Sequence, residues 1–313
     1  SLGPALPSYV WERAMRLEPN LLKCVVFIGH ETPAGFVPCG TGFIIQHIYD
    51  SVSFHFLATA AHVIRDFAGD TFSVRINRMD GRSECIKVKK GSELKHPDAA
   101  ADLAVFGIPV AITPDVHDIT SVDVGRQTRD QEREIVGGIH VGDEVCAIGL
   151  YTSHHGAIRN APVARTGHIA ALPGEPVRVL GGLHVEAYLI ELRTIAGLSG
   201  SPVFYLMPPV RVMPNGGVQA IQKDKSPGVP LGVLVGYHVV ESKEDQIQVP
   251  RFGHVEAAAS GNDQSIDERN TGFGVVVPIE RLDEIFEHPE FVEAVKRDAA
   301  AFKARKDGYK PAG

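Results

Sequence analysis

Three short segments carry residue types that together can perform nucleophilic catalysis. Residues 57–63 read Leu-Ala-Thr-Ala-Ala-His-Val, a run of small residues that ends at His62. Asp102 stands directly before an apolar run, and Ser199 lies in Gly-Leu-Ser-Gly-Ser-Pro. A histidine can take the proton of a serine hydroxyl while an aspartate orients that histidine, so these types suit acyl transfer. Taken singly, His62 is more simply a packed histidine and Asp102 a strand-starting acid.

The serine segment is the most specific of the three. Glycines before and after Ser199 permit a tight turn in which the backbone N–H groups of Gly197 and Ser199 converge on one point. Such a pair of donors is an oxyanion hole, which stabilises the negative oxygen of a tetrahedral intermediate. An ordinary Gly-Ser turn explains this segment equally well on its own. The presence of His62 and Asp102 favours the catalytic interpretation.

The elements that must position these residues are predicted to be strands. Apolar or alternating runs of about five residues recur between Gly, Pro and Asp, a pattern typical of an all-β sandwich or barrel. The runs lie at 21–29, 42–48, 51–58, 71–76, 104–108, 144–150, 177–180, 187–192, 203–205, 231–240 and 273–277. Helical spacing of apolar residues is confined to a short segment near Tyr9 to Leu17 and to Pro278 to Lys306.

A polar stretch divides the predicted strands into two groups. Thr113 to Gly138 has few large apolar residues and is predicted to link two β units, with a boundary near residue 130. Two further polar stretches, Val212 to Pro230 and Glu241 to Asn270, are predicted to be long surface loops. The predicted organisation is an arm with a short helix over 1–20, a first β-barrel over 21–130, a second over 131–278, and a C-terminal helix and tail over 279–313.

Length, composition and charge exclude several classes of protein. The chain has 313 residues, of which 44% are hydrophobic and 22% charged, as in ordinary globular proteins. Lys plus Arg is 31 and Asp plus Glu is 38, so the formal charge of −7 gives no general attraction to nucleic acid or anionic lipid. The longest apolar runs are far shorter than a membrane span requires. Neither nucleic acid nor a membrane is an expected partner.

Cysteine and histidine usage predicts neither a metal nor an organic cofactor. Cys24, Cys39, Cys85 and Cys146 are far apart and form no CxxC pair, so reduced thiols and a cytoplasmic location are expected. No signal peptide is visible, and a periplasmic or secreted location is the alternative if a leader has been removed. The adjacent pair His154 and His155 lacks the spacing of a metal site and is predicted to lie in a solvated loop.

The chain order His62, Asp102, Ser199, each in its own local sequence, resembles that of the trypsin-like, chymotrypsin-fold serine proteases. Gly40 to Ile44 resembles the strand before the catalytic histidine, and Gly272 to Pro278 resembles the last strand of bacterial Htr/Deg-type proteases. The resemblance covers about 22–285, so a following PDZ domain is not expected. It implies an all-β fold of two packed antiparallel β-barrels with a C-terminal helical segment.

The resemblance also implies serine endopeptidase activity on a polypeptide substrate. His62 would be the general base, Asp102 its orienting acid and Ser199 the nucleophile, with the amides of Gly197 and Ser199 as the oxyanion hole. Asp98 is the competing acid, but only Asp102 directly precedes an apolar strand, as the family pattern requires. A latent or inactive protease-like scaffold that binds a protein partner is the alternative.

The resemblance leaves substrate specificity open. The substrate pocket is expected to consist of Arg193, Val235, Gly236, Tyr237, His238, Gly272 and Gly274. If Arg193 points into the pocket, it favours an acidic side chain at P1, the residue before the cleaved bond. If it points outward, the valine-rich walls favour a small or medium apolar P1. His238 also bears on this question, because glutamate-specific bacterial relatives carry a histidine on this strand.

Departures from the family pattern concern activation and access to the site. Leu198 stands where trypsin-type zymogens have an aspartate that pairs with a new N-terminus, so activation by that route is not expected. Cys39 matches one half of a family disulfide, but Val63 stands at the other half. The polar stretch 241–270 lies between two pocket segments and is predicted to act as a lid, and a regulatory protein partner would fit such a device.

Overall fold

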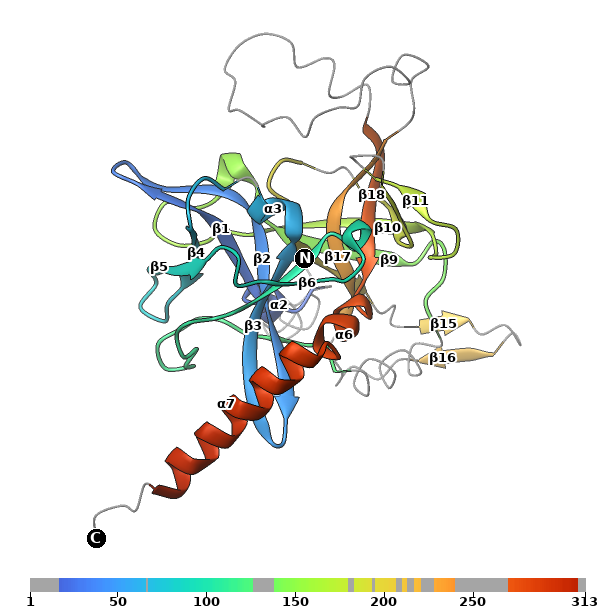
Figure 1. The fold of residues 1–313 in the computed structure, drawn as a ribbon. Helices are drawn as coiled ribbons and strands as arrows, with labels where there is room; N and C mark the ends of the chain where they lie inside the picture. The colour runs from blue at the N-terminus through green and yellow to red at the C-terminus, as the bar shows by residue number, and fades with distance from the viewer. Residues whose placement is uncertain are drawn as a thin grey trace, which may run out of the picture.

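The computed structural model describes residues 17–65, 67–125, 138–179, 183–192, 195–206, 210–212, 217–220, 228–239 and 270–308. Nearly half of these residues are in strands, and the two longest helices lie at the C-terminal end (Figure 1). The elements of the first half are α2 (Pro19–Leu22), β1 (Val25–Thr32), β2 (Gly35–Tyr49), β3 (Val52–Ala60), α3 (Ala61–Arg65), β4 (Thr71–Asn77), β5 (Ser83–Lys89), β6 (Leu94–Lys95), the 3₁₀ helix η1 (Ala99–Ala101), β7 (Leu103–Gly107) and β8 (Val122–Asp123). The second half contains β9 (Glu144–Gly149), η2 (Thr152–His154), β10 (Val163–Ala171), β11 (Val177–Arg178), β12 (His184–Val185), β13 (Tyr188–Glu191), β14 (Ser201–Leu206), β15 (Val210–Val212), β16 (Val218–Ala220), β17 (Gly228–Val239), β18 (Asn270–Pro278), α6 (Arg281–Phe286) and α7 (Pro289–Gly308).

The strands form two β units in chain order. The first is a sheet in the order β5-β4-β1-β2-β3-β7-β6, antiparallel along this path, with β8 added parallel to β2. The second is a closed antiparallel barrel in the order β10-β13-β18-β17-β14-β9. The predicted all-β fold class, two packed antiparallel β-barrels with a C-terminal helical segment, is confirmed, with the second unit closed into a barrel and the first an eight-stranded sheet whose pairings follow an open path.

Strand alternation explains how the two units pack together. Successive side chains on a strand point to opposite faces, and in β1 Val25 and Phe27 join one buried cluster while Val26 and Ile28 join another. β9 behaves in the same way, because Cys146 and Ile148 share the cluster of Val25 and Phe27 whereas its other face fills the barrel. Each unit therefore has its own core, and a third core lies between them.

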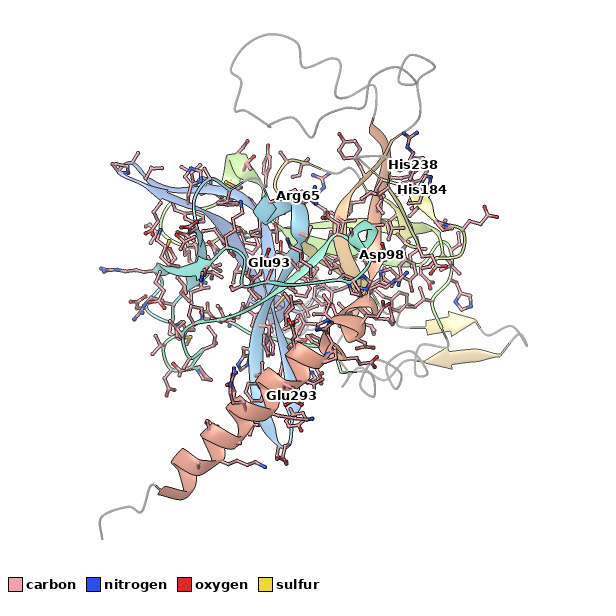
Figure 2. The ribbon with its side chains drawn as sticks, in the orientation of Figure 1. Arg65, Glu93, Asp98, His184, His238 and Glu293 are labelled. Carbon is pink, nitrogen blue, oxygen red and sulfur yellow. The ribbon has the colours of Figure 1, made fainter. Side chains whose placement is uncertain are left out.

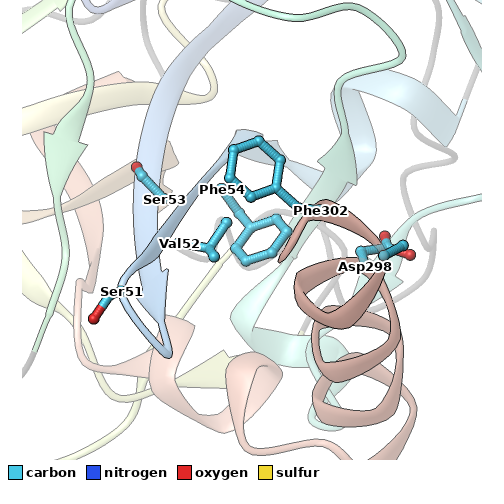
Figure 3. Close-up of a pocket in the computed structure, with 7 residues that line it drawn as sticks. Ser51, Val52, Ser53, Phe54, Asp298 and Phe302 are labelled. Carbon is cyan, nitrogen blue, oxygen red and sulfur yellow. The ribbon is translucent and has the colours of Figure 1, made fainter. Parts of the chain in front are cut away.

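The C-terminal helices cover the core between the units. Phe286 and Phe291 have ring centroids 5.0 Å apart, and Phe291 lies 5.2 Å from Phe56 on β3. Further along α7, Lys303 pairs with Asp50 in the β2–β3 turn. The hollow shown in Figure 3 opens between this hairpin and α7 and contains no residue of the predicted site; it is lined by Ser51, Val52, Ser53, Phe54, Asp298, Ala301 and Phe302.

A buried arginine fixes the loop between β9 and β10 onto the first unit. Arg75 on β4 is 4% exposed, and its Nε donates to Asn160 Oδ1 at 2.6 Å. Its Nη2 donates to the carbonyl of His155 at 2.8 Å, and Asn160 Nδ2 donates back to the carbonyl of Arg75. Because buried polar groups are costly when unpaired, this reciprocal network holds the loop in one place.

Several predictions concern segments that the structure describes only in part. The helix near 9–17, the boundary near residue 130 and the predicted lid over 241–270 lie outside the described residues, apart from Leu17 and Asn270. The prediction of a loop throughout Val212 to Pro230 is wrong, because β15 and β16 form a hairpin there and β17 begins at Gly228. Hairpin hydrogen bonds join backbone groups, so that segment forms strands without the apolar alternation that the prediction required.

Two further findings concern the cysteine thiols and the hydropathy of the helices. Cys24, Cys39, Cys85 and Cys146 are all free thiols. Burial raises the pKa of the Cys146 thiol to about 12. None of the helices in the described ranges is long and apolar enough to cross a membrane.

Candidate active site

His62 lies in the first turn of α3, directly after β3. The register of β3 against β7 pairs Ala60 with Leu103, the residue that follows Asp102. The backbone N–H of Ala61 donates to the carbonyl of Asp102 at 2.7 Å. Small side chains at the end of β3 let the two segments approach this closely. Strand pairing therefore brings together His62 and Asp102, which are 40 positions apart in the sequence.

The Asp102 carboxylate is directed at His62 by both of its oxygens. Oδ1 accepts a hydrogen bond from the backbone N–H of His62 at 3.0 Å, and Oδ2 contacts Nδ1 of its ring. Asp102 ends η1 with a φ of 52°, a left-handed conformation that is uncommon outside glycine. Because a carboxylate only accepts hydrogen bonds, this contact requires the hydrogen on Nδ1. In the neutral ring Nε2 would then be the acceptor, as a general base requires.

A third group contacts the same carboxylate. Arg65, one turn after His62 on α3, places Nη2 3.2 Å from Oδ1 of Asp102. The Arg65 side chain is 51% exposed, whereas that of Asp102 is 17% exposed. Such an exposed cation contributes modestly because water and salt screen it.

Asp98, the competing acid, has a different role. Its Oδ1 accepts from the backbone N–H of Ala100 at 2.9 Å, so Asp98 caps the start of η1. Its own N–H donates to Nδ1 of His96. The structure thus places Asp102 against His62, while the Asp98 carboxylate closes the turn that leads to Asp102.

The Ser199 turn is held by its own backbone between β13 and β14. Gly197 and Gly200 have φ values of 97° and 85°, which glycine adopts without strain. The carbonyl of Leu198 accepts from the N–H of Ser201 at 2.9 Å, and the N–H of Gly200 donates to the carbonyl of Leu234 on β17 at 2.8 Å. The Leu198 side chain is buried in the barrel core. Leu198 therefore anchors the turn by apolar packing.

The two β units meet at this turn. A Cβ added to Gly200 would lie 2.1 Å from the carbonyl oxygen of Thr41, 2.3 Å from Oγ1 of Thr59 and 3.2 Å from the backbone nitrogen of Ala60. Gly200 thus packs directly on the end of β3, two residues before His62. Ser199 is brought beside the His62 helix by backbone contact across the interface between the units.

The N–H groups expected to form the oxyanion hole have no intramolecular acceptor. Within the described ranges, neither the N–H of Gly197 nor that of Ser199 donates a hydrogen bond to another group of the chain. The neighbouring N–H groups of Leu198, Gly200 and Ser201 all donate to carbonyls. The turn therefore leaves unpaired the two donors that could stabilise an oxyanion.

The pairing of β17 and β18 assembles most of the predicted pocket. Gly236 pairs with Val275 and Tyr237 with Gly274, and the N–H of Leu192 donates to the carbonyl of Gly272 at 3.0 Å. Val235 is buried, and Gly236, Tyr237 and His238 are half-buried. Figure 2 shows His238 near the end of β17 and Arg65 on α3, both toward the upper end of the molecule. Arg193 lies outside the described residues.

The catalytic hydrogen bond between the two units is not formed. Among the residues that the structure describes, no hydrogen bond joins His62 to Ser199. Catalytic hydrogen bonds are often long or poorly aligned before substrate binds.

Comparisons with known proteins were made by sequence and by structure. No protein-family model matches the chain, and no curated protein matches it significantly. Among solved structures it is similar to the MamO protease domain from Magnetospirillum magneticum, at 16% identity and a TM-score of 0.42, over 64% of this chain and 90% of that one. It is similar to Deg5 at 18% identity and a TM-score of 0.42, over 74% and 87%. It is also similar to the HtrA-type protease AlgW with a decapeptide, at 16% identity and a TM-score of 0.46, over 90% and 68%.

The matching structures are HtrA/Deg-type protease domains. In this chain, the first β unit carries the His62–Asp102 pair on one side of the junction, and the second unit carries the Ser199 turn on the other.

Two residues of the site were not predicted from the sequence. Arg65 could have been found from its spacing, because residues three apart on a helix are neighbours. Thr41 bonds to Gly197, 156 positions away, and a contact that distant leaves no local signal. Its position between two glycines was the only indication of a crowded backbone.

Proposed function

We propose that this chain is a serine endopeptidase that hydrolyses peptide bonds through an acyl-enzyme. Ser199 Oγ attacks the carbonyl carbon of the substrate as its proton passes to Nε2 of His62. The tetrahedral intermediate collapses, the C–N bond breaks, and the proton on His62 passes to the leaving amine. Water then attacks the acyl-enzyme with the same proton transfers and releases the acid. Asp102 orients the imidazole and stabilises its charged form.

The observation that carries this proposal is the junction at Gly200. Backbone contact there brings the Ser199 turn onto the end of β3, two residues before His62, and Asp102 engages His62 through both carboxylate oxygens. The free N–H groups of Gly197 and Ser199 supply the stabilisation that a tetrahedral oxyanion needs. This arrangement supports the assignment of a base, its orienting acid, a nucleophile and an oxyanion hole to one junction.

The strand pairing of β17 favours a polypeptide as the substrate. Its pairing with β14 ends at Leu234, whereas its pairing with β18 on the other edge continues to Val239. The stretch after Leu234 therefore has one edge that β14 leaves open beside the Ser199 turn. An extended peptide can add to such an edge by backbone hydrogen bonds. This mode of binding would present a peptide carbonyl to Ser199.

The direct test is labelling by a fluorophosphonate, which reacts with activated serines. We expect the native chain to be labelled, and both Ser199→Ala and His62→Ala to abolish labelling. Ser201→Ala is the matched control, because Ser201 belongs to the same segment but its hydroxyl is buried and has no hydrogen-bond partner. Labelling that persists in folded Ser199→Ala would contradict the assignment of the nucleophile.

A peptide-library digest then addresses specificity. Cleavage after acidic residues would be expected if Arg193 or His238 supplies a positive charge to the pocket. Cleavage after small apolar residues would be expected if Val235 and its neighbours set the preference. Substitution of His238 by Gln separates the two contributions, because a charge from Arg193 would survive it.

A second candidate function is a latent or inactive protease-like scaffold that binds a protein partner. It is favoured by one observation, that His62 and Ser199 make no hydrogen bond to each other in the described structure. Absence of labelling in a folded chain would support it. Labelling that appears only after a partner protein is added would indicate a regulated protease.

A further inference from the structure

Thr41 on β2 is the hydrogen-bonding centre of the junction between the two units. Its side chain and backbone are fully buried. Its N–H donates to the carbonyl of Ser199 at 3.0 Å, and its carbonyl accepts from Oγ1 of Thr59 at 2.7 Å. Its hydroxyl donates to the carbonyl of Gly197 at 2.6 Å and accepts from the N–H of Leu150 at 2.8 Å. One buried side chain therefore bonds two separate segments of the second unit.

The strand β2 does not need the Thr41 hydroxyl in order to form. Strand pairing uses backbone groups, and an apolar β-branched residue would fill the same space. Loss of the hydroxyl would leave the part-buried carbonyl of Gly197 and the buried N–H of Leu150 without these partners. Unpaired buried groups are costly, so the turn and the β9–β10 loop would rearrange to recover hydrogen bonds.

The bond to Gly197 holds the peptide that lies between the two expected oxyanion-hole donors. Gly197 has a φ of 97°. This backbone conformation is strained for residues with a side chain, whereas glycine adopts it freely and can also leave it easily. A hydrogen bond to its carbonyl fixes the plane of the peptide between Gly197 and Leu198. The carbonyls of Leu198 and Ser199 are fixed by Ser201 and by the N–H of Thr41. The Thr41 hydroxyl thus completes a series of three held carbonyls.

We propose that Thr41 is a positioning residue whose hydroxyl holds the Gly197 carbonyl and thereby keeps the N–H groups of Gly197 and Ser199 directed at the oxyanion. The proposal rests on the proposed peptidase function. It assigns to the first β unit, which carries the base, a part in organising the oxyanion hole of the second. Leu150 packs on Gly197 from the other side, since a Cβ added to Gly197 would lie 2.9 Å from its side chain.

The test compares Thr41→Val, which removes the hydroxyl at nearly constant shape, with Thr41→Ser, which keeps it. The substrate is the best peptide from the library digest, and kcat and KM are measured on the full chain. We expect Thr41→Val to lower kcat by about 10²-fold, as loss of an oxyanion-hole donor does, with little change in KM. Thr41→Ser is expected to stay within about fivefold of the native kcat, because the hydrogen bond is retained.

A pair of inhibitors separates positioning from a general structural effect. A peptide aldehyde adds to Ser199 and places an oxyanion in the hole, whereas the matching peptide alcohol binds without adding. Thr41→Val should weaken the aldehyde by about 10²-fold and leave the alcohol nearly unchanged. Equal weakening of both, or an unchanged kcat in Thr41→Val, would overturn the proposal.

Two controls keep the result interpretable. Ser73→Ala removes another fully buried hydroxyl of the first unit, one that accepts from Lys87 rather than from the site, and its kcat should match the native value. If Thr41→Val does not fold, Thr41→Cys fills a similar space with a weak donor and should show an intermediate loss of kcat. A native chain that fluorophosphonate does not label contradicts the peptidase function and this proposal together, whereas a labelled native chain with an unaffected Thr41→Val contradicts only the second.

Discussion

The two β units position their parts of the candidate site in different ways. The first unit uses ionisable side chains: His62 and Arg65 both contact the Asp102 carboxylate, on a helix and a turn that β3 and β7 bring together. The second unit uses backbone: Ser199 stands in a turn in which three successive carbonyls, those of residues 197–199, are held by hydrogen bonds and whose glycines have positive φ. Side-chain contacts can be changed singly at little cost to the fold. A close-packed backbone turn tolerates almost no added atom.

Because of this difference, substitutions in the two units should affect activity and folding differently. In the first unit, a substitution that keeps the shape but changes hydrogen bonding or charge should reduce activity and leave the fold intact. In the second unit, one added methyl group should disturb both. Measuring activity and stability on the same variants separates these two effects.

The largest effect is expected from Asp102→Asn. The amide keeps the shape of the carboxylate, but it can no longer accept from both the N–H and the ring Nδ1–H of His62. His62 would then favour the wrong tautomer, a change that lowers kcat by about 10⁴-fold in proteases with such a triad. Steady-state kinetics and thermal unfolding of the same sample would show lost activity with a nearly native unfolding temperature.

Asp98→Asn is the matched control for this change. Asp98 caps η1 by accepting from Ala100, and asparagine caps a helix about as well as aspartate. Its activity should therefore remain near the native value. A loss in Asp98→Asn as large as that in Asp102→Asn would reverse the assignment of the two acids.

The next largest effect is expected from Gly200→Ala. The new Cβ would lie 2.1 Å from the carbonyl oxygen of Thr41, and the φ of 85° is strained for alanine. Overpacking and left-handed strain together predict a loss of about 2 to 5 kcal/mol in the free energy of unfolding. Displacement of Ser199 should also slow fluorophosphonate labelling by at least about 10²-fold. Chemical denaturation and labelling kinetics measure the two effects.

Gly174→Ala controls for the glycine substitution itself. Gly174 is exposed, and a Cβ there would meet no atom within 4 Å. Its stability and labelling rate should match those of the native chain. If Gly200→Ala behaves in the same way, the junction between the units is looser than the contact distances indicate.

The parts of this molecule that follow from local pattern could be predicted from the sequence. The short apolar run from Val25 to Ile28 predicts a buried strand, and both of its faces are buried in the structure. The glycines beside Ser199 predict a turn because few other residues adopt positive φ. The helical spacing after Pro278 predicts the C-terminal helices in the same way.

The parts that depend on distant contacts could not be predicted. The hydroxyl of Thr41 finds its partners in another unit, and nothing near it in the sequence specifies them. The β15–β16 hairpin was not predicted from the sequence, because its backbone pairing does not need an apolar pattern. Asp98 and Asp102 were separated only by the resemblance to a family, whereas the structure separates them by what each carboxylate contacts.

The smallest effect is expected from the charge of Arg65. Arg65→Gln keeps an N–H donor for Asp102 but removes a positive charge close to the imidazolium that forms on His62 during catalysis. Because like charges disfavour that imidazolium, kcat/KM should rise by about two- to threefold at low salt. The side chain is 51% exposed, so the difference should shrink between about 0.05 M and 0.5 M salt as screening increases. Arg65→Lys retains the charge and should keep the native salt dependence. A change in Arg65→Gln that is independent of salt would show that Arg65 acts by geometry, as the backbone of the second unit does, and would remove this part of the contrast between the units.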